Sequence, residues 1–315
     1  MKILVTGCAG FIGANFCEYW LNSYPADTVI GVDSLTYAAN LSALEGLKLN
    51  DKFTFYKENI CNSPAVEEIF EKEQPEVVIN FAAESHVDRS IDSSRIFIES
   101  NVLGVQSLLD ASLKYGVKRF HQISTDEVYG DLPLDSVERF SENSPLKPSS
   151  PYSASKAAAD LLVLSYHKTH GLPVTISRSA NNYGKYQHEE KLVPKVVAYA
   201  KANKPIPIYG TGLNVRNWLF VEDHARAIDL ILKQGNIGEI YNVGDEIYLT
   251  NIQMVERILS YMDKPSDFVV YTEDRKGHDR KYALNCDKLR ADTGWTPKAD
   301  FKDALKSVVL WYKSK

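Results

Sequence analysis

Gly7-Cys8-Ala9-Gly10-Phe11-Ile12-Gly13 indicates the architecture of this 315-residue chain. It follows an apolar run, Lys2 to Thr6, that predicts a buried parallel strand, and it opens a segment of helical periodicity, Gly13 to Tyr24. In this spacing the first glycine allows a tight turn, the second allows the close approach of a pyrophosphate, and the third allows the helix to pack closely on the strand. The segment therefore predicts a dinucleotide site at a helix N-terminus.

An acidic residue follows at the distance that a dinucleotide site requires. The next expected strand, Thr28 to Val32, ends at Asp33, twenty residues after Gly13. A carboxylate in this place can accept hydrogen bonds from both ribose hydroxyls and would repel a 2′-phosphate. The expected cofactor is therefore NAD rather than NADP.

Strand-like and helical segments alternate over the first 180 residues and predict an α/β fold with a doubly wound parallel Rossmann sheet. Further strands are expected at 53–57, 77–82, 119–124 and 174–178, and helices at 63–72, 98–115 and 153–170. A helix at 191–202 and a Pro-rich strand-like stretch at 204–210 then predict a smaller mixed α/β domain. We expect domains at 1–180 and 181–315, with segments near 218–221 and 239–243 returning to the first.

Composition narrows the class of protein. Hydrophobic residues are 44% and charged residues 24%, and the formal net charge of −5 argues against a general binder of nucleic acid or anionic membranes. The four cysteines lack metal-ligand spacing, so we expect free thiols and no metal site. No run reaches the roughly 18 apolar residues of a transmembrane helix, and the N-terminus does not look like a signal peptide. The expected location is the cytoplasm.

Tyr152 and Lys156 lie four residues apart at the start of an expected helix, and therefore on one helix face. A nearby ammonium favours a phenolate, so we expect the pKa of Tyr152 to fall toward the working range. A tyrosinate can take a proton from a sugar hydroxyl while a hydride leaves the same carbon. This spacing is common by chance, but its place downstream of a dinucleotide motif favours hydride chemistry.

Thr125-Asp126-Glu127 follows the strand expected at 119–124, at the carboxyl end where doubly wound sheets bind ligands. Two adjacent carboxyls in a sequestered site do not both ionise easily, so one pKa should rise. The pair would then offer a protonated acid, Asp126, beside an ionised base, Glu127, which together can expel water. A solvated loop with a helix cap is the alternative.

With these motifs in place, the chain resembles the extended short-chain dehydrogenase/reductases, and within them the nucleoside-diphosphate-glucose 4,6-dehydratases. The likeness covers nearly the whole chain. Besides the glycine segment, it rests on Phe81–Asp88, Ser124–Gly130, Pro151–Lys156, Asn181–Gly184, Glu190–Pro194, Asn214–Trp218 and Asp274–His278.

The resemblance implies a lyase that keeps its NAD bound and makes a 4-keto-6-deoxy sugar for deoxysugar biosynthesis. Tyr152 would deprotonate the glucose 4-hydroxyl, while Thr125 holds the 4-oxygen and Lys156 holds the cofactor ribose. Glu127 would then remove the C5 proton as Asp126 protonates the departing 6-hydroxyl.

The resemblance also implies two sets of binding residues. Those expected at NAD are Gly7, Gly10, Phe11, Ile12, Gly13, Asp33, Ser34, Leu35, Thr36, Asn59, Ile60, Phe81, Ala82, Ala83, Ser85, Ser100, Tyr152, Lys156 and Asn182. Those expected at the nucleotide sugar are Ser85, Thr125, Asn181, Lys191, Leu192, Pro207, Ile208, Tyr209, Arg216, Asn251, Arg275 and His278.

Several alternatives stay open from sequence. The expected substrate is dTDP-glucose, with UDP-glucose as the rival. A nucleotide-sugar 4-epimerase or decarboxylase would need Tyr152 and Lys156 but not the Asp-Glu pair, and a non-catalytic NAD sensor would need none of them. The resemblance further implies a homodimer formed through the helices at 98–115 and 153–170.

Overall fold

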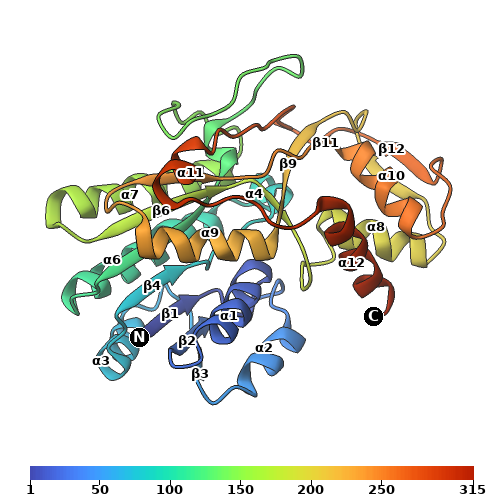
Figure 1. Cartoon of the computed structure of the whole chain (residues 1–315). Helices are drawn as coiled ribbons and strands as arrows, with labels where there is room; N and C mark the ends of the chain where they lie inside the picture. Colours follow the sequence, from blue (N-terminus) through green and yellow to red (C-terminus); the bar gives the residue numbers. More distant parts are fainter.

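The computed structural model describes residues 1–315 and is built around one seven-stranded sheet. All of its neighbouring strands pair in parallel, in the order β10-β6-β5-β4-β1-β2-β3 (Figure 1). This arrangement confirms the predicted doubly wound α/β fold. The strands are β1 (Lys2–Thr6), β2 (Thr28–Asp33), β3 (Phe53–Lys57), β4 (Val77–Asn80), β5 (Arg119–Thr125), β6 (Val174–Ser179) and β10 (Ile240–Val243).

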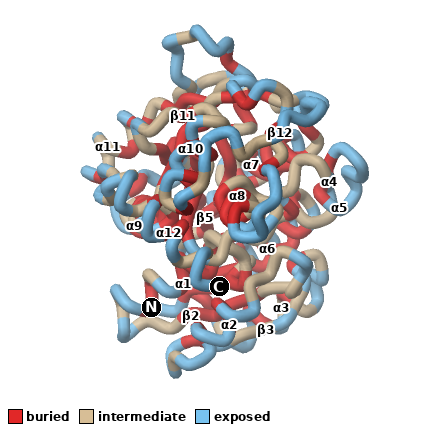
Figure 2. The backbone as a smooth tube through the Cα atoms, turned by 90° about the vertical axis from the view of Figure 1, so that its right-hand side faces the viewer, coloured by how far each residue is buried: buried red, intermediate tan, exposed pale blue.

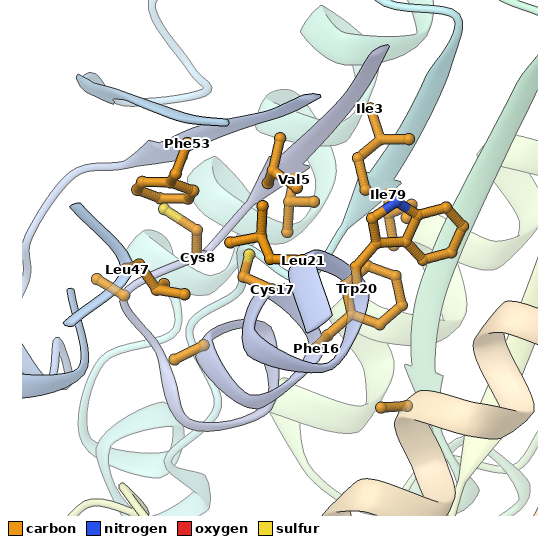
Figure 3. Packing of buried hydrophobic residues seen from close by; sticks show 14 of the residues in the cluster. Ile3, Val5, Cys8, Phe16, Cys17, Trp20, Leu21, Leu47, Phe53 and Ile79 are labelled. Atoms are coloured by element: carbon orange, nitrogen blue, oxygen red, sulfur yellow. The ribbon is translucent and has the colours of Figure 1, made fainter. Parts of the chain in front are cut away.

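Helices cover both faces of the sheet, which explains why its strands are apolar on both sides. Ile3 and Val5 of β1 pack beneath α1 on one face, while Leu4 points into the core on the other. Figure 3 shows the first of these cores, and Figure 2 shows buried chain running through the middle of the molecule. The first face carries α1 (Phe11–Ser23), α2 (Leu41–Lys48) and α9 (Val221–Gln234); the second carries α3 (Ser63–Glu73), α6 (Gly104–Lys114) and α7 (Pro151–His170).

The strand order reverses between β1 and β4, and ligands of such sheets bind outside the carboxyl ends at this point. Gly7 follows β1 with a φ of +67°. A Cβ atom added to Gly7 would lie 2.7 Å from the backbone nitrogen of Ala82, just beyond β4. The two chain segments therefore touch where the crevice begins.

The second part of the chain forms two small sheets and a helical layer around a core that includes Trp218, Met254 and Leu305. One sheet has the order β11-β9-β7, and the other pairs β12 with β8. The strands are β7 (Asn181–Tyr183), β8 (Ile206–Tyr209), β9 (Val215–Phe220), β11 (Tyr248–Thr250) and β12 (Val269–Thr272); the helices are α8 (Leu192–Lys201), α10 (Asn251–Tyr261), α11 (Asp287–Thr293), which lies against α9 and β10, and α12 (Phe301–Lys313).

The structure differs from the sequence expectations in two places. Residues 240–243 return to the large sheet as β10, but 218–220 lie in β9 of a small sheet, where they pair with β7. The single helix expected at 98–115 is α5 (Arg95–Ile98), a π-helical turn η1 (Glu99–Leu103) and α6. The domain boundary at residue 180 stays a prediction. None of the helices has the length and apolar character that crossing a membrane requires.

The contact at Gly7 generates a stability prediction. Gly7 and Gly116 share a φ of +67°, but a Cβ at Gly116 would meet nothing within 4 Å. Because alanine in this conformation is strained, Gly116→Ala should lower the free energy of unfolding by about 1 kcal/mol. Gly7→Ala should lower it clearly further, since its methyl group collides with the backbone at Ala82. Guanidinium unfolding measures both, and equal losses would contradict the crowding argument.

Candidate active site

The loop between β1 and α1 forms a cradle that only glycine fits. A Cβ at Gly13 would lie 2.2 Å from the carbonyl oxygen of Gly7, so the helix can pack this closely only without a side chain. Gly10 precedes α1 and provides no side-chain cap, which leaves the first-turn N–H groups free for an anion. These features fit the pyrophosphate of a dinucleotide.

Asp33 closes the far end of this cradle. Its carboxylate accepts hydrogen bonds from the backbone N–H groups of Ala9, at 3.0 Å, and Leu35, at 2.8 Å. Burial raises the pKa of Asp33, and these two bonds oppose the rise. The carboxylate is thereby fixed at the end of β2 with lone pairs left for ribose hydroxyls, as NAD requires.

A cavity runs from the glycine loop to the carboxyl end of β5 and brings most of the predicted cofactor and catalytic residues together. Its lining includes Gly7, Gly10, Phe11, Ile12, Gly13, Phe81, Ala83, Ser85, Thr125, Asp126, Glu127, Tyr152, Lys156, Asn181, Asn182 and Lys191. The predicted cofactor residues that do not line it are Asp33, Ser34, Leu35, Thr36, Asn59, Ile60, Ala82 and Ser100. Among these, Ile60 is buried and lies directly beneath Gly104 of α6, so its side chain belongs to the core.

The two carboxyls lie in a short 3₁₀ turn, η2 (Asp126–Tyr129), that continues from β5. Thr125 begins the turn: its Oγ1 accepts a hydrogen bond from the N–H of Glu127 at 3.2 Å and lies 3.3 Å from Oδ1 of Asp126. Oδ2 of Asp126 is buried without a hydrogen-bond partner. A protonated Asp126 thus has an oxygen free to act on a ligand.

The surroundings divide the two carboxyls into an acid and a base. Burial, then the neighbouring Glu127, raises the pKa of Asp126 well above its usual range. Burial also raises the pKa of Glu127, but Lys191 and Arg216 oppose that rise by favouring the ionised form. Of the two carboxyls, Asp126 is therefore the one whose protonated form its surroundings favour more; its role as the acid stays a prediction.

Tyr152 and Lys156 are held by the first turns of α7. Ser150 caps this helix through a capping box with Ser153, and Nζ of Lys156 donates to the carbonyl oxygen of Ile123 at 2.6 Å. Burial lowers the pKa of Lys156 to about 8. Burial also raises the pKa of Tyr152, with Glu127 adding to the rise and a hydrogen bond to Thr125 opposing it. The expected fall in the pKa of Tyr152 is therefore wrong: burial and Glu127 raise it, and Lys156 is not among the groups that act on it.

Asn101 is a positioning residue that the sequence reasoning missed. It lies in the π-helical turn, accepts a hydrogen bond from the N–H of Glu84 at 2.9 Å, and donates to the Glu84 carbonyl oxygen and to Oγ of Ser155. Ser155 in turn donates to the carbonyl oxygen of Tyr152 at 2.7 Å. The wide turn thus connects the segment after β4 to the start of α7, and helical periodicity gave no signal of it.

A second cavity adjoins the first and shares Ser85, His86, Glu127, Asn181, Glu190 and Lys191 with it. Its lining contains further predicted substrate residues, Leu192, Arg216, Arg275 and His278. Pro207, Ile208, Tyr209 and Asn251 do not line it. Ile208 is only 3% exposed and belongs to the core of the second part of the chain.

Cationic groups converge on this second cavity. Arg216 stacks over Tyr282 at 4.4 Å and donates to the carbonyl oxygen of Asp279 at 2.9 Å. Nζ of Lys191 donates to the carbonyl oxygen of Ser85 at 3.0 Å, and burial lowers the pKa of this lysine. Burial likewise lowers the pKa of His278, which contacts Asp274. Arginine and lysine in a half-buried cavity suit a diphosphate.

Several lining residues were not predicted. Glu190 contacts Arg89 at 2.6 Å and lies near His86, and Arg89 stacks over Tyr37 at 3.7 Å. These contacts connect the segment before α8 to the segments that follow β2 and β4, across the mouth of the first cavity. The sequence signal that could have identified Glu190 was its position directly before Lys191, within the Glu190–Pro194 motif. The other unpredicted lining residues are Ala38, Ile123, Ser124, Ser179, Ala180, Gln187, His188, Val87, Ser149, Ser150, Gly277, Asp279 and Tyr282.

Comparison with known proteins agrees with this geometry. The profile of the GDP-mannose 4,6 dehydratase family matches residues 4–308. The chain belongs to this family. A dTDP-glucose 4,6-dehydratase of Haemophilus influenzae is 47% identical over 99% of this chain and 98% of that protein.

Solved structures of dehydratases and epimerases share the fold. DesIV, a dTDP-glucose 4,6-dehydratase of Streptomyces venezuelae with NAD and dTDP bound, is 42% identical, has a TM-score of 0.96, and covers 100% of this chain and 98% of its own. A UDP-glucose 4-epimerase of Thermotoga maritima with UDP-glucose is 30% identical, has a TM-score of 0.91, and covers 100% of this chain and 99% of its own. The fold alone therefore does not separate the two reactions, and the carboxyl pair must.

The raised pKa of Asp126 predicts a dependence of stability on pH. The folded protein holds this proton to a higher pH than the unfolded chain, whose carboxyl has a pKa of about 3.9. The stability it contributes is complete below that value and is lost as pH rises through the raised, folded pKa. Asp126→Asn is neutral throughout, so it should gain on wild type as the pH rises from about 4 through the raised pKa of the folded protein, by about 1.4 kcal/mol per unit of pKa elevation.

Urea unfolding across this pH range tests the prediction. Asp51→Asn, at an exposed position, is the matched control, and its difference from wild type should stay nearly constant. Parallel curves for Asp126→Asn and wild type would show that the buried carboxyl is not strained by ionisation.

Proposed function

We propose that this protein is an NAD-dependent dTDP-glucose 4,6-dehydratase, a hydro-lyase that makes dTDP-4-keto-6-deoxy-glucose. The observation that carries the proposal is the buried Asp126-Glu127 pair in one cavity with Tyr152 and Lys156. An epimerase needs the second pair alone, whereas the loss of water needs an acid and a base in addition. The names of the relatives at 42–47% identity support this assignment.

The residues act in sequence on the glucose ring. Tyr152 accepts the proton of the 4-hydroxyl, with Thr125 hydrogen-bonded to the 4-oxygen. NAD, when bound, would supply the hydride acceptor for C4 and the hydride donor for C6. The 4-ketone makes the C5 proton acidic; Glu127 removes this proton, and Asp126 protonates the 6-hydroxyl, which leaves as water. Glu127 then returns a proton to C5 when the hydride is delivered to C6. Glu127 suits the role of base because Lys191 and Arg216 favour its ionised form.

The two cavities suggest where each ligand is held. The glycine loop and the N-terminus of α1 would bind the pyrophosphate of NAD, and Asp33 its ribose. Lys156 would hold the second ribose from the floor of the first cavity. Arg216, Arg275 and His278 would bind the diphosphate of the sugar nucleotide in the second. Glu127 lines both cavities, which supports its role as the base at the point where the two ligands would meet.

The substrate assignment is tested by turnover. The purified protein should convert dTDP-glucose to a product that absorbs in the near ultraviolet after addition of alkali, the signature of a 4-keto-6-deoxy sugar. UDP-glucose, the alternative substrate, should give a lower kcat/KM. No such product from either nucleotide sugar would overturn the proposal.

Glu127→Gln should separate binding from water loss. The variant keeps the shape of the side chain but cannot take the C5 proton, so product formation should fall by about 10²-fold or more. Exchange of the C5 proton with deuterated solvent should fall with it, while dTDP binding stays near that of wild type. Glu138→Gln, in the exposed loop after η2, is the control and should retain full turnover. Undiminished exchange in Glu127→Gln would remove this residue from the role of base.

We also propose that two copies associate through α5–α6 and α7. Ile96, Ile98, Leu103, Leu113 and Leu161 of these helices are exposed, Leu161 by 59%. Light scattering should show a dimer for wild type and a monomer for Leu103→Asp combined with Leu161→Asp. The Leu49→Asp protein, whose substitution lies after α2 at a leucine even more exposed than Leu161, should remain dimeric. A double variant that stays dimeric would rule out this interface.

We place the protein in the cytoplasm. Its four cysteines are unpaired, and three of them are buried. Free buried thiols suit a reducing compartment.

A further inference from the structure

Arg275 is held by a carboxylate that no motif argument assigned a role. Asp88 lies in the first turn of α4 (Val87–Asp92), shortly after β4 of the large sheet, whereas Arg275 follows β12 in the second part of the chain. Nε of Arg275 lies 2.5 Å from Oδ1 of Asp88, and Nη2 donates to Oδ2 at 3.0 Å. The ion pair is therefore two-pronged in its contacts, with a hydrogen bond from Nη2 and none from Nε, and it joins the two parts of the chain.

A third side chain fixes the same carboxylate. The hydroxyl of Tyr209, at the end of β8, donates to Oδ2 of Asp88 at 3.4 Å, and the guanidinium of Arg275 lies 5.3 Å from the centre of the Tyr209 ring. The edge of the guanidinium is thus held by Asp88 and its face by Tyr209. An arginine fixed in both ways loses little further freedom when it binds a ligand.

The pair leaves the other edge of the arginine for a ligand. A guanidinium has five N–H donors, and Asp88 engages the edge formed by Nε and Nη2. Nη2 is the one side-chain nitrogen of Arg275 that makes a hydrogen bond within the protein, which leaves Nη1 free. Arg275 lines the second cavity, as do His86 and Val87, but Asp88 does not. The carboxylate therefore holds Arg275 from outside the cavity.

We propose that Asp88 is a positioning residue for substrate binding, which aims the free edge of Arg275 at the diphosphate of the nucleotide sugar. This inference rests on the proposed function, because the anion that Arg275 meets is the diphosphate of that substrate. A phosphate oxygen matches the vacant donors of the guanidinium, as the carboxylate matches the occupied ones. The net positive charge for the diphosphate then comes chiefly from Arg216 and Lys191.

The alternative hypothesis, that Asp88 competes with the diphosphate for Arg275, predicts the opposite change in affinity. If Asp88 competed with the diphosphate for Arg275, removing its charge would free the arginine and tighten binding. If Asp88 positions Arg275, removing its charge releases the arginine to many conformations and weakens binding. The sign of the change in affinity therefore separates the two readings.

The experiment compares Asp88→Asn with wild type, using dTDP as the calorimetric probe and dTDP-glucose in steady-state assays. The Kd for dTDP and the KM for dTDP-glucose should rise about tenfold, while kcat stays within about twofold, because the reacting groups are untouched. Glu246→Gln is the matched control. Glu246 forms a similar two-pronged pair with Arg139 at 3.1 and 3.0 Å, but lines neither cavity, so both constants should be unchanged.

The same measurement in an Arg275→Lys protein shows whether the effect of Asp88→Asn on the Kd depends on Arg275. Lysine cannot make the two-pronged pair, so Asp88→Asn should add little to the Kd of an Arg275→Lys protein. Asp88→Glu keeps the charge but misplaces it by one methylene, and should raise the Kd about threefold if aspartate's reach matters. If Asp88→Asn lowers the midpoint of unfolding, the Asp88→Glu variant is used instead to test whether the position of the carboxylate affects the Kd.

The inference is overturned if Kd is unchanged in both Asp88 variants, if it falls, or if Asp88→Asn weakens binding equally in the Arg275→Lys background. These outcomes are separate from failure of the proposed function. In that case the wild-type protein itself would not bind dTDP or convert dTDP-glucose.

Discussion

The contact between the ends of β1 and β4 is the constraint on which the rest of the structure depends. Gly7 lies against the backbone of Phe81 and Ala82, with no room for a side chain. Because the strands on either side of this point run outward in opposite order, the crevice above it is where cofactor and substrate can meet. The loop after β4, which contains Ser85 and leads to Asp88, leaves the sheet at the same point. Both cavities therefore begin at one place.

Burial determines the protonation of the groups in the first cavity, whereas charged side chains determine what the second cavity can bind. Asp126, Tyr152 and Lys156 all lie in surroundings that disfavour their charged forms, which raises the pKa of the acids and lowers that of the lysine. Arginine, lysine and histidine side chains line the neighbouring cavity. Glu127 stands between them, buried yet within the influence of Lys191 and Arg216. One carboxyl of an adjacent pair is thus kept protonated while the other is helped to ionise.

Much of the fold and the catalytic centre could be predicted because each depends on local sequence. The glycine spacing, the strand that ends at Asp33, and the Tyr152 and Lys156 pair all lie within one or two elements. The carboxyl pair could be placed because it directly follows a predicted strand. The predictions that failed concern features that depend on contacts distant in sequence. The π-helical turn at Asn101 is held by hydrogen bonds to Glu84 and Ser155, and the pKa of Tyr152 is set by its burial. No pattern in the sequence of the helix at 98–115 encodes those partners.

The return of β10 to the edge of the large sheet has a mechanical consequence. The chain leaves that sheet after β6, builds β7, β8 and β9, and comes back through α9 before it leaves again for β11. The chain therefore crosses between the two halves of the molecule several times near one edge of the crevice, so the halves are not joined by a single linker. Such tethers favour rotation about a common axis over free separation. A truncation after β6 would also remove an edge strand from the sheet, so the cofactor half is not a contiguous piece of the sequence.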